Sequence, residues 1–182
     1  MVGANSVLTC PLPFAFRTVC AFLCRPLPDF PRLLSEIAEH VTYVTPWSAG
    51  TARVPSSAFC CLFKLCLLRP TAEQVAALLE YPDAPQVRAL GFLFLRYACP
   101  PKDLWTWLAP WMKDSELFAP TPDRSDRVTV GEYVLSLVTQ PQYHGSLLPR
   151  IPLTTKRNMM LKVRLCVLPC LSTAHVCFGL RR

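Results

Sequence analysis

Cysteine is the residue type in this chain with the widest chemical repertoire, because thiolates bind metals and act as nucleophiles. The chain has 182 residues, among them ten cysteines and three histidines. A structural zinc site needs four such ligands, usually in closely spaced pairs. Cys60 and Cys61 are adjacent, so on a helix their side chains would point about 100° apart. With Cys66 and Cys99 they lack a second pair or a histidine cluster, and we predict four small buried residues and no bound metal.

The other cysteines lie near the two ends of the chain, where their spacing is closer to that of metal ligands. Cys20 and Cys24 are separated by three residues, as are Cys166 and Cys170, and His175 follows. A zinc ribbon also needs turns between its ligands, and these segments lack turn residues. The spacing alone therefore does not predict a site.

The sequence contains no pattern typical of an enzyme. It has no G-x-S-x-G nucleophile motif, and its six glycines form neither a G-x-G-x-x-G fingerprint nor a phosphate-binding loop. Two carboxylate pairs, Asp114 with Glu116 and Asp123 with Asp126, lie in a polar segment where solvation explains them. We therefore predict no catalytic residues, no cofactor and no small-molecule substrate.

Three clustered tryptophans are the strongest indication of binding. Trp105 and Trp107 precede Trp111, and Pro110 must kink or break a helix between them. On one helix Trp107 and Trp111 would share a face while Trp105 points elsewhere, so we expect at least one indole at the surface, where tryptophan is typical of protein interfaces. The alternative is that Trp107 and Trp111 belong to the core and Trp105 covers its edge.

The net charge of +7 would suggest a nucleic-acid partner if it were spread over the folded part of the chain. Residues 29–159 contain 13 basic and 12 acidic side chains, whereas residues 1–28 and 160–182 contain six basic ones and no acid. The predicted domain is thus nearly neutral, which weakens the argument for direct RNA binding.

Both ends of the chain are apolar, but neither predicts a membrane segment. Residues 1–28 lack the basic start of a secretory signal, and we expect them to be disordered. Residues 165–180 carry no charge but include Pro169, and they are shorter than the ~20 residues that a bilayer requires. We treat residues 160–182 as an irregular tail.

The apolar pattern of residues 29–159 predicts a single, elongated, all-α domain. After Asp29, apolar residues recur at a spacing that places them on one face of a helix. A second predicted helix follows Ser56 or Ser57, contains Leu62 and is apolar on almost every side. Capping boxes are formed by Thr71 with Gln74 and by Thr129 with Glu132. No segment alternates with a period of two, and Asn-Gly or Asp-Gly turns are absent, so we expect no hairpin.

Residues 86–97 form the most distinctive predicted helix, since two arginines interrupt an otherwise apolar run that includes Leu93. Pro85 favours its start, and Pro100 with Pro101 favours its end. For Arg88 and Arg96 we expect ion pairs with carboxylates inside the domain. The candidate partners are Asp83, Asp103 and Asp114.

This helix (QVRALGFLFLRY), followed by PP and DLWTW, resembles the signature of the pre-mRNA-splicing factor 38 family. Further motifs occur in the same order: VTPW at residues 44–47, SAFCCLFKL at 57–65, and LPRIP at 148–152. The resemblance covers residues 29–159. It marks five residues as a structural signature, namely Arg88, Arg96, Tyr97, Pro149 and Arg150.

The resemblance implies a nuclear, non-enzymatic scaffold of the spliceosome, associated with the tri-snRNP and acting at activation of the precatalytic complex. Its implied partners are other spliceosomal proteins, with weak or indirect RNA contact and no membrane. The sequence departs from the family where residues 1–28 replace a helix and where the segment between Trp47 and Ser57 is shortened to about nine residues. One alternative is a direct RNA-binding helical module using Arg150, Lys156 and Arg157; another, a membrane-associated protein, rests on the apolar ends alone.

Overall fold

The fold consists almost entirely of helices, as predicted. The structure, a computed structural model, describes residues 29–50, 54–124 and 126–174, with side chains up to residue 165. The helices are α2 (Phe30–His40), α3 (Ser57–Leu68), α4 (Ala72–Leu79), α5 (Pro85–Ala98), α6 (Leu104–Leu108), the 3₁₀-helix η1 (Ala109–Lys113), α7 (Val130–Thr139) and α8 (Leu153–Ala174). The prediction of an all-α domain is confirmed. The expectations for residues 1–28, including Cys20 and Cys24, lie outside the described residues.

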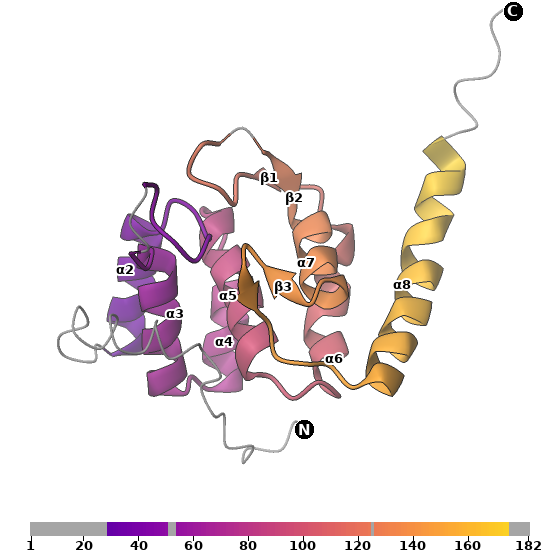
Figure 1. The fold of residues 1–182 in the computed structure, drawn as a ribbon, viewed down its shortest axis with the longest axis horizontal. Coiled ribbons are helices and arrows are strands. Elements are labelled where there is room, and N and C mark those ends of the chain that lie inside the picture. The colour runs from indigo at the N-terminus through magenta and orange to yellow at the C-terminus, as the bar shows by residue number, and fades with distance from the viewer. Residues whose placement is uncertain (1–28, 51–53, 125, 175–182) are drawn as a thin grey trace, which may run out of the picture.

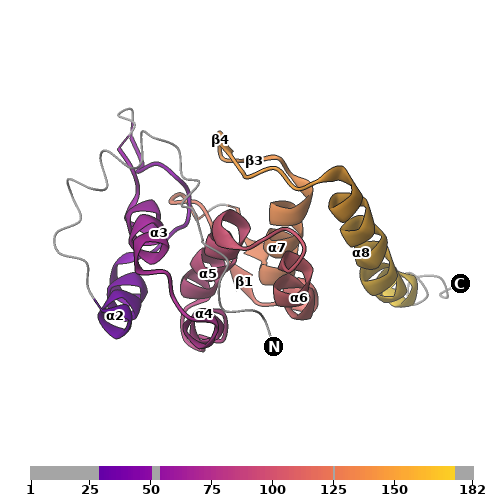
Figure 2. The same ribbon diagram turned by 90° about the horizontal axis from the view of Figure 1, so that it is seen from below.

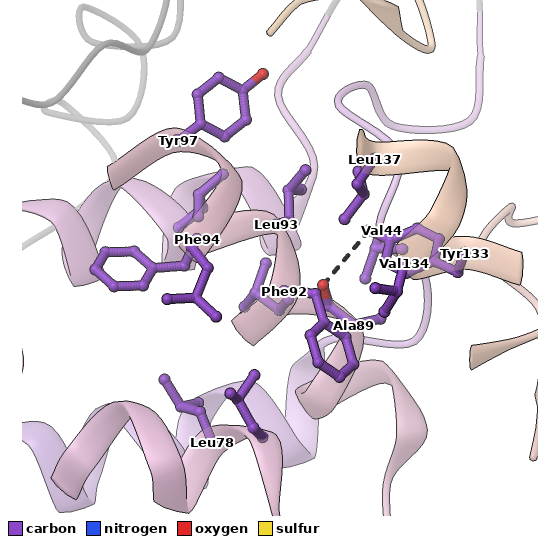
Figure 3. Close-up of a cluster of buried hydrophobic side chains, with 14 of the residues drawn as sticks. Val44, Leu78, Ala89, Phe92, Leu93, Phe94, Tyr97, Tyr133, Val134 and Leu137 are labelled. Carbon is purple, nitrogen blue, oxygen red and sulfur yellow. Dashed lines mark hydrogen bonds between the residues drawn. The ribbon is translucent and has the colours of Figure 1, made fainter. Parts of the chain in front are cut away.

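Helix α5 forms the centre of the domain, because it is buried on every side. Figures 1 and 2 show the helices following one another along the molecule, from α2 and α3 through α4 and α5 to α6 and α7, with α8 at the far end. Every residue from Val87 to Tyr97 is buried. Figure 3 shows part of this core, in which Leu78, Phe92, Leu93 and Val134 belong to one cluster. The run of apolar residues in α5 therefore reflects burial on all sides.

Local capping explains where several helices begin and end. The hydroxyl of Ser56 accepts a hydrogen bond from Phe59 N, and both predicted capping boxes, at Thr71 and at Thr129, form with reciprocal bonds. Asp29 precedes α2 but makes no side-chain capping bond. Helix α5 begins at Pro85 and ends at Ala98, before the two prolines, as the sequence indicates.

Four strands of two residues each were not predicted. Strand β1 (Leu117–Phe118) pairs antiparallel with β2 (Val128–Thr129), and β3 (Gln142–Tyr143) pairs antiparallel with β4 (Ser146–Leu147). The β3–β4 turn places His144 at φ 43° and Gly145 at φ 78°. Two consecutive residues with positive φ suit a tight hairpin turn, and His144 occupies the position where asparagine or aspartate is more common. The turn therefore lacks the Asn-Gly or Asp-Gly pair on which the expectation of no hairpin was based.

Buried tyrosines attach the β3–β4 hairpin to the core. The Tyr133 hydroxyl donates to the Tyr143 hydroxyl at 3.3 Å, and the Tyr143 hydroxyl donates to Val44 O at 3.0 Å. The hydroxyls of Tyr97 and Ser146 lie 3.2 Å apart. These bonds satisfy polar atoms that would be costly to bury alone, so the hairpin has a fixed position against α5 and α7.

Helix α8 continues through the predicted boundary between residues 159 and 160. An irregular tail was expected from residue 160, yet the backbone is helical to Ala174, and Met159 and Val163 are both buried. The start of α8 is rich in lysine, arginine, methionine and leucine, which favour helix, and this outweighs the weak periodicity of the tail. Among the described residues, no helix is long and apolar enough to cross a membrane.

We predict that truncating a core leucine destabilises the domain strongly. Leu62 and Leu93 are both 0% exposed. Leu93→Ala should lower the free energy of unfolding by ~2 to 5 kcal/mol, because it removes buried methyl groups and leaves a cavity. Urea unfolding followed by circular dichroism measures this. The control, Leu147→Ala on β4, changes a side chain that is 67% exposed and should cost below ~0.5 kcal/mol. Equal losses in the two variants would contradict the described core.

We also predict that alkaline pH destabilises the domain. Burial raises the pKa of Tyr97, Tyr133 and Tyr143, and burial together with the Asp103 carboxylate raises the pKa of Cys99 from 9.0 to about 12. The folded state therefore holds these protons more tightly than the unfolded state does. Stability should be constant below the unfolded pKa values and fall as pH rises above about 9.

Unfolding by urea at a series of pH values tests this expectation. Tyr143→Phe removes one of the four groups, so this variant should lose stability with pH less steeply than the wild type, although it is less stable at neutral pH. A pH dependence that is the same in both proteins would show that Tyr143 is not a buried, neutral phenol.

Candidate protein-binding surface

The candidate surface is built on a buried ion pair. Arg88, on α5, has a side chain that is only 8% exposed. Its Nη1 donates to Asp114 Oδ2 at 3.0 Å, and its Nη2 pairs with Glu116 Oε2. The expected carboxylate partner at Asp114 is confirmed, whereas Glu116 was not anticipated. The other candidates, Asp83 and Asp103, make no ion pair with the described arginines.

Arg88 therefore holds the segment that follows η1 against α5. The same segment is bound from its other side by the first turn of α7: Gly131 N donates to Asp114 O at 3.0 Å, and Val130 N donates to Glu116 O at 2.9 Å. These two amides lie at a helix start, where no partner exists within the helix. The approach is close, since a Cβ on Gly131 would lie 2.6 Å from Met112 O, and glycine is required there.

Trp111 belongs to this cluster. Its ring packs edge to face against Phe92, with centroids 5.6 Å apart, and the Arg88 guanidinium carbon lies 5.8 Å from its centroid. The indole is partly exposed and packs against the core. Trp111 is thus held in place by a charged and an aromatic neighbour from α5.

Arg96 lacks the carboxylate partner that we predicted, and this expectation was wrong. It is buried, and its Nε donates to Leu137 O at 2.8 Å. Lys156 Nζ donates to Thr139 O at 2.8 Å in the same turn. The last carbonyls of a helix have no partner within it and carry partial negative charge, so the end of α7 takes the place of a carboxylate. Burial lowers the pKa of Arg96, and the adjacent Tyr97 partly offsets this shift.

The other two clustered tryptophans lie on α6. Leu104 and Leu108 are its buried residues, while Trp105 and Trp107 are partly exposed and pack against the core. Lys162 of α8 lies over the Trp105 ring, with Nζ 5.5 Å from the centroid. The predicted break at Pro110 occurs, since α6 ends at Leu108 and η1 follows. All three clustered indoles thus contact the core and keep some exposure, a result that combines our two alternatives.

The five signature residues occupy different positions. Arg88, Arg96 and Tyr97 are buried on α5 and bind the loop after η1, the end of α7 and the β3–β4 hairpin. Pro149 is half-buried and Arg150 is exposed, in the segment between β4 and α8. The structure therefore brings three of the five into the core.

Of the four central cysteines, Cys61 and Cys66 are buried, and Cys60 and Cys99 are partly buried. The part of the chain that the structure describes contains no cluster of three or more metal-binding side chains. The raised pKa of Cys99 keeps its thiol protonated at neutral pH, so it is a poor nucleophile.

Comparisons with known proteins agree on one family. The family model described as the PRP38 family matches residues 23–160. The chain is 39% identical over 134 residues to Pre-mRNA splicing factor SR-like 1 of Arabidopsis thaliana, a match that covers 74% of this chain and 34% of that protein. It is 33% identical over 151 residues to Pre-mRNA-splicing factor 38B of Homo sapiens, covering 73% of this chain and 28% of that protein. The chain thus spans about a third of these relatives or less.

One solved structure is similar over most of the chain. It is a chain in the crystal structure of the Snu23-Prp38-MFAP1(217-258) complex of Chaetomium thermophilum. The superposition has a TM-score of 0.71 and covers 90% of this chain and 86% of that one, at 19% sequence identity. At this identity the similarity shows a shared fold.

We predict that the Arg88 ion pair is needed for stability. Arg88→Met keeps much of the aliphatic stem but leaves Asp114 and Glu116 without a cation, and it should lower the free energy of unfolding by about 2 kcal/mol or more. This value allows for the partial exposure of Glu116, which weakens its share. Denaturant unfolding provides the measurement, and Arg157→Met on α8, at an exposed position, is the control. Similar stability of the two variants would show that the pair contributes nothing.

Proposed function

The chain belongs to the PRP38 family, and we propose that it acts in pre-mRNA splicing as a non-enzymatic scaffold that contacts other spliceosomal proteins in the nucleus. The family match confirms the resemblance seen in the motifs. The relatives named above are splicing factors. The structural neighbour comes from a complex with Snu23 and MFAP1, which supports protein contact as the mode of action.

The observation that supports this proposal most directly is the set of partly exposed indoles on α6 and η1. Trp105, Trp107 and Trp111 each pack against the core and keep part of the ring accessible. Two of them are held in position by neighbours, because Arg88 and Phe92 contact Trp111 and Lys162 lies over the ring of Trp105. Pre-positioned aromatic side chains lose little conformational entropy on binding, which is typical of protein interfaces.

The distribution of charge supports a protein partner over RNA. Residues 1–132 contain 12 basic and 12 acidic side chains, so this part of the chain carries no surplus of positive charge that would release counterions from a phosphate backbone. Arg150 and Arg157 are exposed, but Lys156, the third residue of the RNA alternative, is bonded to Thr139 O. The direct RNA-binding alternative thus rests on fewer residues than the sequence suggested.

Within this function we assign the chain to the tri-snRNP and to activation of the precatalytic complex. The family resemblance is what supports this finer assignment. We propose Trp105, Trp107 and Trp111 as the partner-binding residues, with Arg88 supporting Trp111 from α5.

A pull-down from nuclear extract tests the proposal. The tagged full chain should recover spliceosomal proteins, and Trp105→Ala should reduce that recovery while the circular dichroism spectrum is unchanged. Leu117→Ala, which removes an exposed apolar side chain on β1, is the matched control and should keep the partners.

The same preparations separate the scaffold from the RNA module. We expect the full chain to bind single-stranded RNA weakly and without sequence preference. If Trp105→Ala keeps all partners and the wild type binds RNA tightly at physiological salt with sequence preference, the RNA-module alternative replaces the scaffold.

A further inference from the structure

Helix α8 presents two opposite faces. Met159 and Val163 are buried toward the body of the domain, whereas Leu161 is 59% exposed and Leu165 is 76% exposed. At about 100° per residue, Leu161 lies roughly 160° around the helix from both buried residues. Figures 1 and 2 show α8 at the end of the molecule, with no other labelled element on its far side. Two leucines four residues apart therefore face outward together.

Two arginines continue this apolar pair into a stripe. Arg157, Leu161, Arg164 and Leu165 follow the spacing i, i+4, i+7 and i+8, which places them on one side of a helix, and all four are exposed. We call these four residues the outer α8 surface. Among the described residues, neither arginine forms an ion pair.

The other cations of α8 already have roles inside the chain. Lys156 bonds to the end of α7 and Lys162 lies over Trp105. No acidic residue occurs from residue 133 onward, so nothing in this part of the sequence neutralises the two outer arginines. The full net charge of +7 comes from the basic residues of this part, because residues 1–132 are balanced.

We propose that the outer α8 surface docks an acidic amphipathic helix of a spliceosomal partner protein. This inference rests on the proposed function and adds a second contact to the tryptophans of α6. An apolar stripe on the partner would cover Leu161 and Leu165, and flanking carboxylates would pair with Arg157 and Arg164, which suit bidentate bonds to carboxylates.

Other occupants fit the surface less well. A second copy of the chain would place identical arginines against each other, and like charges at a two-fold interface repel. Single-stranded RNA binds where bases stack on aromatic rings, and α8 contains no aromatic residue. A lipid surface would need a broader apolar face than two leucines.

A photo-cross-linking amino acid at position 161 of the full chain tests the inference. In nuclear extract it should capture a protein segment whose sequence is acidic and apolar at helical spacing, while the same group at Leu147 of β4, another exposed leucine, should not capture that segment. The segment, made as a synthetic peptide, should bind the purified chain with an affinity that falls as salt rises.

Charge reversal provides the matched test. Arg157→Glu with Arg164→Glu should weaken binding of that peptide by at least about tenfold, since two charge-assisted contacts become repulsive. Arg32→Glu with Arg127→Glu changes the net charge equally at exposed positions elsewhere and should leave binding near the wild-type value.

The outcomes distinguish the two proposals. Cross-links to RNA, to lipid, to a second copy or to a segment without acidic residues, or equal effects of the two charge reversals, would overturn the docking of an acidic helix. Recovery of spliceosomal proteins by the wild type would still support the scaffold in those cases. If the wild type recovers no spliceosomal protein, the scaffold function itself is refuted.

Discussion

The pairing of the buried Arg88 with Asp114 and Glu116 is the constraint on which the candidate surface depends. An arginine taken out of water without partners would cost several kcal/mol, so the carboxylates must stay close to α5. This requirement fixes the segment after η1, and the backbone bonds from Val130 and Gly131 fix the same segment against α7. Trp111, the aromatic residue of η1, is thereby placed at a defined edge of the domain.

The end of α7 also binds cationic side chains, but through backbone carbonyls in place of carboxylates. Its last carbonyls accept bonds from Arg96 of α5 and Lys156 of α8, so one helix terminus joins three helices. The contact of Lys162 with Trp105 adds a link between α8 and α6. Helix α8 is therefore attached to the domain by polar and cation–π contacts as well as by Met159 and Val163, and its outer face remains available.

Because of these contacts, the helices differ in what they contribute to the molecule. The centre, α5, is buried and positions its neighbours, α6 and η1 present aromatic edges, and α8 presents a basic, apolar stripe. Such an arrangement suits a scaffold, since separate partners could bind the two surfaces without competing for one site. The chain spans about a third of its relatives' length or less, so these surfaces belong to the part of those proteins that this chain matches.

The sequence by itself determined the helical class, the two capping boxes, the ends of α5 and the break at Pro110, because these depend on interactions between residues a few positions apart. It also placed Asp114 among three candidate partners of Arg88 and Arg96. Tertiary structure alone decided that Glu116 joins this pair, that Arg96 binds the end of α7, that His144 allows a hairpin and that Lys162 covers Trp105. Each of these features involves either residues far apart in the chain or a backbone conformation stabilised by distant contacts. A local sequence pattern does not specify which distant groups come together when the core packs.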